Sequence, residues 1–188
     1  LEDAKRDNDR IIAVIRGGAI NHDGKAASLS SPNVLAQQSL LKKALKDSGL
    51  NAQDVGYVET HGTGTALGDP IEIQAIKEIY GDSRDDGSRC YLSSVKSNIG
   101  HLEGAAGIAG MIKAILALEN NSIPPQINFE TLNPVIDIDN SSLQISKELI
   151  PWKSNAKKKR VAGVSSFGIS GTNAHVLIEE SPYRELLT

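Results

Sequence analysis

The segment VGYVETHGTGTALGDPIE, residues 55–72, decides the fold because it places a strand, a glycine-rich turn and a helix start in immediate succession. Residues 55–59 form a short apolar run that predicts a buried strand. The turn that follows carries His61 beside a glycine, which lets a ligand or another backbone approach closely. Asp69 is predicted to cap the next helix, and Glu72 stands three residues after it, as in a capping box. The segment therefore predicts an α/β unit with a histidine at the end of a strand.

A second glycine-rich turn, KSNIGH at residues 96–101, follows a predicted strand at residues 91–95 and ends on His101. Histidine is the side chain that most readily exchanges protons and hydrogen bonds near neutral pH. Both turns follow an apolar run and both carry a histidine. We therefore interpret them as two parts of one site.

The rest of the chain alternates strand-like and helix-like segments, which is the pattern of an α/β fold. IIAVIR at residues 11–16 predicts a buried strand that ends at Gly17 and Gly18. The Ser-Pro pair at residues 31–32 is predicted to cap and begin a helix that ends at Gly49. Further strands are predicted at residues 143–145, 161–166 and 174–178.

The predicted helix at residues 104–118 is apolar or small nearly all round, interrupted by Lys113, and this pattern predicts burial. Gly104, Gly107 and Gly110 share one face at a three-residue spacing. Each glycine costs a helix roughly 1 kcal/mol relative to alanine. We therefore expect this face to pack closely against another backbone.

Composition narrows the classes of function. The 188 residues carry a net charge of −3, which does not favour a nucleic-acid or anionic-membrane partner. No apolar run is long enough to span a bilayer, and the charged N-terminus lacks a secretory signal. The single cysteine, Cys90, excludes an internal disulfide framework and suits a cytoplasmic protein. Because the chain does not begin with methionine, we expect it to be part of a longer polypeptide.

Three stretches together resemble the β-ketoacyl synthase family, and most of all the ketosynthase domains of modular polyketide synthases. They are THGTGTALGDPIE at residues 60–72, VKSNIGHLEGAAG at 95–107 and GVSSFGISGTNAH at 163–175. Long motifs in a common order are more specific than any short pattern. The resemblance implies an α/β, thiolase-like fold with a layered αβαβα arrangement of two similar halves. Residues 1–181 resemble only its C-terminal half, and residues 182–188 are interpreted as a tail or the start of a linker.

The family performs a decarboxylative Claisen condensation between a cysteine-bound acyl thioester and a malonyl-type extender on an acyl carrier protein. The resemblance implies that this chain supplies two catalytic histidines but not the nucleophilic cysteine, so we expect the isolated chain to be inactive. The implied partners are the N-terminal ketosynthase half that carries the cysteine, the carrier protein, and a second copy in a homodimer of the intact enzyme. Substrates would arrive on the carrier's 4′-phosphopantetheine arm, and no directly bound cofactor or metal is expected.

The resemblance also assigns roles to residues of the two turns. His61 and His101 are expected to donate hydrogen bonds to a thioester oxygen and to hold the enolate charge. Lys96 is matched to the family's active-site lysine, and Glu103 is its expected partner because a buried lysine needs one. Asn98 is expected to hold the His101 turn.

Three further residues receive roles in the same way. Thr63 and Thr65 match the hydroxyls that hydrogen-bond the phosphopantetheine arm. Phe167 matches a gating phenylalanine, and its backbone N–H is expected to complete the oxyanion hole for the acyl thioester.

Alternatives remain open at this point. The chain is also compatible with a non-condensing ketosynthase-like module, a dimerisation or docking scaffold, or a fatty-acid condensing enzyme. His22 is interpreted as a turn residue, His175 as a structural histidine bonded to the preceding loop, and Cys90 as a small residue at a strand edge. The basic cluster at residues 157–160 is interpreted as a solvated turn.

Overall fold

The computed structural model describes residues 1–24, 31–154 and 158–182, and its centre is a mixed six-stranded sheet. The strand order is β1-β8-β7-β2-β3-β5, where β2, β3, β5 and β7 are parallel and β8 runs antiparallel to its neighbours β1 and β7. The strand bounds are Ala13–His22 for β1, Val55–Glu59 for β2, Cys90–Ser93 for β3, Leu143–Ile145 for β5, Val161–Phe167 for β7 and Thr172–Glu180 for β8. The predicted α/β class is therefore confirmed.

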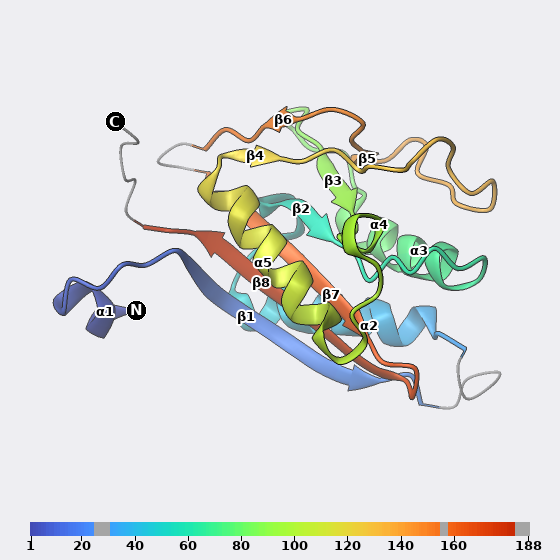
Figure 1. Cartoon of the computed structure of the whole chain (residues 1–188), viewed down its shortest axis with the longest axis horizontal. Coiled ribbons are helices and arrows are strands. Elements are labelled where there is room, and N and C mark those ends of the chain that lie inside the picture. The colour runs from blue at the N-terminus through green and yellow to red at the C-terminus, as the bar shows by residue number, and fades with distance from the viewer. Residues whose placement is uncertain (25–30, 155–157, 183–188) are drawn as a thin grey trace.

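Helices cover both faces of this sheet (Figure 1). Helix α5, Ala106–Glu119, lies across β7 and β8 on one face, while α2, Val34–Ser48, and α3, Gly68–Tyr80, pack on the other. Two apolar clusters fill the spaces between the layers. In β2, Tyr57 belongs to the cluster under α5 and the next residue, Val58, to the cluster under α2 and α3, because successive strand residues point to opposite faces.

Several short elements complete the described chain. A second, two-stranded sheet pairs β4, Ser122–Ile123, with β6, Ile150–Pro151. The remaining elements are helix α1 at Glu2–Arg6, helix α4 at Lys96–Ile99, and the 3₁₀ helices η1 at Ala52–Asp54 and η2 at Glu103–Ala105. No helix among the described residues has the length and apolar character to cross a bilayer.

The first strand differs from its prediction in both length and burial. β1 continues through Gly17 and Gly18, and its side chains Ile15 and Ile20 are 66% and 74% exposed, because the strand lies at the sheet edge. The pairing with β8 shifts register between Ile15 and Gly17, and a side chain at Gly17 would meet the Ser48 backbone at the end of α2. The two glycines therefore mark a bulge and a close approach of two backbones rather than the strand end.

Helix α2 begins two residues later than predicted. Its N-cap is Asn33, whose side-chain oxygen accepts hydrogen bonds from the backbone N–H groups of Leu35 and Ala36, so the predicted cap at Ser31 is wrong. Gly49 ends the helix with φ of +68°, as predicted, because glycine adopts the left-handed conformation without strain.

Helix α5 is only partly buried, in contrast to the prediction. Ile108, Ile112 and Leu116 recur every four residues and are 55%, 52% and 51% exposed, so one apolar face of the helix has no cover among the described residues. The opposite face packs on the sheet through small residues. We call the exposed residues Ile108, Ile112 and Leu116 the α5 stripe.

Two of the three glycines on the predicted face make close contacts, but with side chains rather than with the expected backbone. A side chain at Gly107 would lie 3.1 Å from the Ser166 hydroxyl, and one at Gly110 would lie 3.0 Å from Cγ of Glu59. Gly104 has open space around it and lies before the helix, in η2. The close partners are side chains of β7 and β2 rather than another backbone.

The basic cluster at residues 157–160 is not simply a solvated turn. Arg160 is 6% exposed and forms an ion pair with Glu180, the last residue of β8. Lys158 forms an exposed ion pair with Asp86. Residues 155–157 and 183–188 lie outside the described part of the chain, so the predicted tail at 182–188 falls almost entirely outside it.

Gly110→Ala is expected to destabilise the fold by about 1 kcal/mol, because overpacking of about 1–3 kcal/mol exceeds the helix-propensity gain of about 1 kcal/mol. The measurement is the urea midpoint of unfolding of the wild-type and variant proteins. Gly104→Ala is the matched control, because its new methyl group meets open space. Equal midpoints for the two variants would contradict the packing argument.

Candidate active site

The two predicted histidine turns meet at one edge of the sheet. β2 ends at Glu59, two residues before His61, and β3 ends at Ser93, ahead of the α4 turn that leads to His101. Because β2 and β3 are parallel, their carboxyl ends lie side by side and bring the loops together. The ring centres of His61 and His101 are 5.4 Å apart at an interplanar angle of 82°. The structure therefore brings the two turns together, as the prediction of a single site requires.

Phe167 joins the same group from the end of β7, which is also parallel to β2. Its ring centre lies 5.3 Å from that of His61. Its backbone N–H donates to Nδ1 of His61 at 3.3 Å. The expected use of this N–H in an oxyanion hole is thus not seen here, because the histidine ring already accepts it.

Both imidazoles use the same ring nitrogen to accept a backbone N–H. His101 Nδ1 accepts the Glu103 N–H at 2.9 Å, as His61 Nδ1 accepts the Phe167 N–H. A neutral imidazole whose Nδ1 accepts must carry its proton on Nε2. These hydrogen bonds therefore assign both histidines as Nε2–H donors.

The electrostatic environment keeps His61 neutral. Burial lowers the pKa of His61 to about 4, and the nearby charge of Lys96 acts in the same direction. At neutral pH the ring is therefore a hydrogen-bond donor without positive charge.

The His61 loop is held by the buried carboxyl group of Glu72, which was predicted to belong to a helix capping box. Glu72 accepts the backbone N–H of His61 at 2.7 Å and that of Gly62 at 2.8 Å. Asp69 accepts the N–H of Gly64 at 3.1 Å. The predicted capping box is wrong, because α3 begins at Gly68 and both carboxylates face the preceding loop instead of the helix's own first turn.

Gly62 is the tightest point of this loop. Its φ is +44°, and a side chain there would lie 2.5 Å from Oγ1 of Thr60 and 2.8 Å from Cβ of Ser94. The Ser94 hydroxyl also donates to the Gly62 carbonyl at 3.1 Å, which connects the His61 loop to the residue after β3. The glycine is required here by both conformation and space.

Lys96 has different charged neighbours from the one predicted. Burial lowers the pKa of Lys96, while Glu72, Glu59 and Asp69 oppose this shift. Among the ion pairs between described residues, none joins Lys96 to Glu103, which is exposed and instead donates its backbone N–H to His101. The expected Lys96–Glu103 pair is therefore wrong, and the carboxylates around Lys96 come from β2 and the start of α3.

The remaining predicted residues lie at the rim of the site. Asn98 is exposed and its side-chain oxygen accepts from the Ser97 hydroxyl, so the His101 turn is held by Glu103 rather than by Asn98. Thr63 and Thr65 lie on the His61 loop, with hydroxyls 3.4 Å apart, and Thr65 also accepts the Gly68 N–H.

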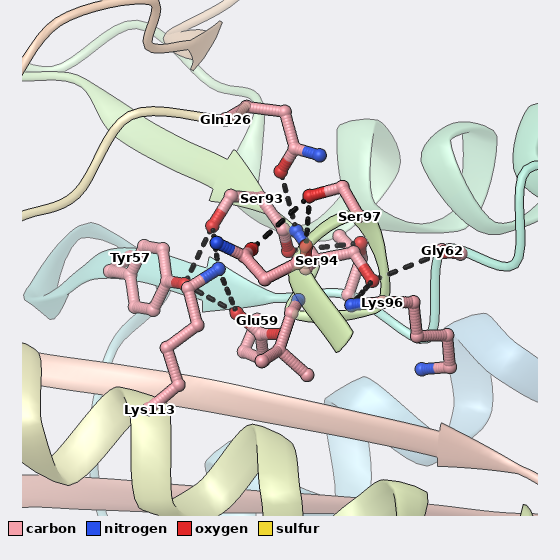
Figure 2. Close-up of polar contacts among 12 residues, drawn as sticks. Tyr57, Glu59, Gly62, Ser93, Ser94, Lys96, Ser97, Lys113 and Gln126 are labelled. Carbon is pink, nitrogen blue, oxygen red and sulfur yellow. Dashed lines mark hydrogen bonds and ion pairs between the residues drawn. The ribbon is translucent and has the colours of Figure 1, made fainter. Parts of the chain in front are cut away.

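Sequence reasoning missed a buried polar cluster beneath the two loops, drawn in Figure 2. We call Tyr57, Glu59, Ser93 and Lys113 the buried polar cluster; Lys113 reaches it from α5. A charged residue in an otherwise apolar strand and a lone lysine in an otherwise apolar helix were the available signals. Neither pattern says that the two charges meet.

Cys90 and the two other histidines lie away from this group. Cys90 is fully buried as the first residue of β3, and burial raises the pKa of its thiol to about 12, which agrees with its structural assignment. His22 closes a turn by accepting the Gly24 N–H. His175 is fully buried, but its ring bonds Tyr80 and Ser165 rather than the preceding loop.

Comparison with known proteins agrees with the class of protein that the sequence motifs and the fold indicate. Residues 12–130 match the family model of the beta-ketoacyl synthase C-terminal domain, and residues 133–187 match the ketoacyl-synthetase C-terminal extension. The chain therefore belongs to the β-ketoacyl synthase family.

Relatives and solved structures make the class more specific. The chain is 50% identical to a phenolphthiocerol/phthiocerol polyketide synthase of Mycobacterium tuberculosis and 46% identical to erythronolide synthase EryA3 of Saccharopolyspora erythraea. Each match covers 97% of this chain but only 10% and 6% of those proteins. The ketosynthase from module 6 of the Bacillus subtilis bacillaene synthase is 40% identical with a TM-score of 0.89, over 98% of this chain and 33% of that one.

The Streptomyces albus oxazolomycin ketosynthase domain OzmH KS7 is similar to the same degree, with 41% identity and a TM-score of 0.88 over 98% of this chain and 34% of that one. The chain thus corresponds to the C-terminal half of a ketosynthase of modular polyketide synthases, and its fold is the thiolase-like fold of those domains.

The ionisation of Glu72 is expected to make the stability of the fold depend on pH. Burial raises the pKa of Glu72 from 4.5 to about 7 against the pull of its two N–H donors, so the folded state favours the protonated acid. The stability contributed by this preference is complete below pH 4.5 and is lost as pH rises to about 7.

Urea unfolding of wild type and Glu72→Gln across this range is the measurement. The stability difference in favour of wild type should shrink by on the order of 3 kcal/mol between pH 4.5 and 7.5, because glutamine does not titrate. Parallel pH curves for the two proteins would show that Glu72 ionises normally.

Proposed function

We propose that this chain forms the histidine-bearing half of a ketosynthase that performs decarboxylative Claisen condensation. The observation that carries the proposal is the pair of adjacent imidazoles, each with Nδ1 occupied by a backbone N–H. Within the described part of the chain no hydrogen bond uses Nε2 of either ring, so each Nε2–H is left to donate. Two adjacent donors suit a reaction in which negative charge develops on a thioester oxygen.

In the proposed reaction a malonyl-type thioester loses carbon dioxide, and the electron pair of the broken bond becomes an enolate. His61 and His101 stabilise that enolate through Nε2–H. The enolate carbon attacks the acyl thioester carbonyl, and the cysteine of the other half leaves as thiolate. Lys96 holds the positive potential of the site and takes no part in bond making.

Substrate delivery by the 4′-phosphopantetheine arm of an acyl carrier protein is part of the same proposal. Thr63 and Thr65 lie on the loop beside His61, and their hydroxyls are close enough for one to donate to the other. One hydroxyl hydrogen then remains for a carbonyl of the arm. No cofactor bound by this chain itself is required for the reaction proposed here.

The N-terminal half with the nucleophilic cysteine is the proposed partner of the α5 stripe. The stripe leaves three large aliphatic side chains more than half exposed on one helix, which is unfavourable in water. The solved ketosynthases to which this chain is similar are about three times its length, so most of their fold lies outside it. Homodimerisation and a cytoplasmic location, with the one cysteine a buried thiol, complete the proposal.

No observation specifically favours the alternative functions considered in the sequence analysis. A non-condensing module or a docking scaffold does not need two imidazoles with matched tautomers. The fatty-acid alternative would use the same chemistry, but the relatives named above are polyketide synthases.

The test of the proposal is His61→Ala and His101→Ala in the complete ketosynthase. Each is expected to lower condensation with a malonyl carrier protein by about 10²–10³-fold, which is the usual effect of removing one oxyanion donor. Acyl transfer to the cysteine of the other half, followed by intact mass, should persist. Lys42→Ala is the control, because Lys42 is an exposed residue of α2, which packs on the face of the sheet opposite α5. Unchanged condensation in both site variants would refute the proposed roles.

A second prediction concerns this chain alone. Incubated with acyl thioesters, it should gain no acyl mass, because the thiol of Cys90 is fully buried and its pKa is raised to about 12. Intact mass spectrometry is the measurement, and the complete ketosynthase is the positive control. An acyl adduct on Cys90 would contradict the proposal that the nucleophilic cysteine lies in the other half.

A further inference from the structure

The buried polar cluster contains an ion pair that the proposed chemistry does not use. Glu59 is 2% exposed and its carboxylate lies 3.0 Å from Nζ of Lys113, whose side chain is 14% exposed. The same Nζ donates to the Ser93 hydroxyl at 2.7 Å. The Tyr57 hydroxyl contacts both Glu59 and Ser93, at 2.5 and 2.7 Å.

Glu59 also reaches the backbone of the second histidine turn. One carboxylate oxygen accepts the Val95 N–H at 2.5 Å while the other faces Lys113 and Tyr57. Val95 directly precedes Lys96. Figure 2 shows Glu59 between Lys113 on one side and the Ser94–Ser97 turn on the other, with the Lys96 side chain directed away from the ion pair.

The ion pair therefore joins the three elements that carry the site. Glu59 lies two residues before His61 on β2, and Val95 begins the turn that leads to His101. Lys113 belongs to α5, which starts five residues after His101. A shift of β2 relative to the second turn changes the distance between the two imidazoles, and the ion pair anchors both of these elements to α5.

Stability alone is a poor explanation for this arrangement. Burying two charges costs desolvation that their attraction seldom exceeds, and apolar replacements of such pairs are often neutral or stabilising. The glycine at position 110 keeps the space that Glu59 occupies, since a side chain there would lie 3.0 Å from Cγ of Glu59. Both the packing and the hydrogen bonds are thus arranged around the Glu59 carboxylate.

We propose that Glu59 and Lys113 are positioning residues that fix the Lys96–His101 turn against the His61 loop for the decarboxylation and condensation step. Lys113 neutralises Glu59 and orients its carboxylate, and Glu59 holds the turn through the Val95 N–H. This inference rests on the proposed function, because it concerns the step that needs both imidazoles.

The experiment is Lys113→Met in the complete ketosynthase, with two steps measured separately. Methionine keeps the length and apolar stem of lysine but leaves Glu59 without its cation. Condensation with a malonyl carrier protein is expected to fall at least tenfold, while acyl loading of the other half's cysteine stays within about twofold. Lys113→Arg, which keeps the charge, should lose less than Lys113→Met.

A double variant tests the coupling. Glu59→Gln combined with Lys113→Met removes both charges and keeps an oxygen that can accept the Val95 N–H. It is expected to condense faster than Lys113→Met alone, because no uncompensated charge remains. A double variant as slow as the product of the two single losses would overturn the positioning role.

Leu41→Ala is the matched stability control, since Leu41 is a core residue under α2, on the other face of the sheet. It is expected to lower both steps together. If Lys113→Met also lowers both steps in parallel, or leaves condensation unchanged, the inference is wrong. Failure of the proposed function looks different, because condensation would then also survive His61→Ala and His101→Ala.

Discussion

Two buried carboxylates, Glu59 and Glu72, set the constraint on which the site depends. A carboxylate out of water must find donors, and here the donors are backbone N–H groups of the loops that carry the histidines. Glu72 accepts from His61 and Gly62, and Glu59 accepts from Val95. The need of these two buried carboxyl groups for hydrogen-bond donors therefore helps to determine where the imidazoles lie. The site is preorganised by the core beneath it rather than by its own rim.

Local patterns in the sequence predicted the elements that carry the site. Residues 55–59 and 143–145 form strands with the predicted bounds, and Gly49 ends its helix as expected. These predictions succeeded because each depends on neighbours within a few residues. The grouping of His61, His101 and Phe167 was also predicted, from motifs whose order resembles one family.

Predictions that needed distant partners failed for a common reason. Asp69 and Glu72 have the spacing of a capping box, but their carboxylates accept backbone N–H groups of the preceding loop instead. Glu103 is near Lys96 in sequence, but the charges that act on that lysine come from β2 and α3. The Glu59–Lys113 pair spans 54 positions, and no periodicity in either segment connects them.

The geometry of Gly62 has a consequence for how such a chain can change over generations. With φ of +44° and neighbouring atoms at 2.5 and 2.8 Å from a Cβ, every side chain collides with Thr60 and Ser94, the residues that directly follow β2 and β3. Any missense change of that codon adds a Cβ, so every one of them disturbs the same contacts. Changes that preserve the fold must therefore occur at positions that do not lie between these two turns.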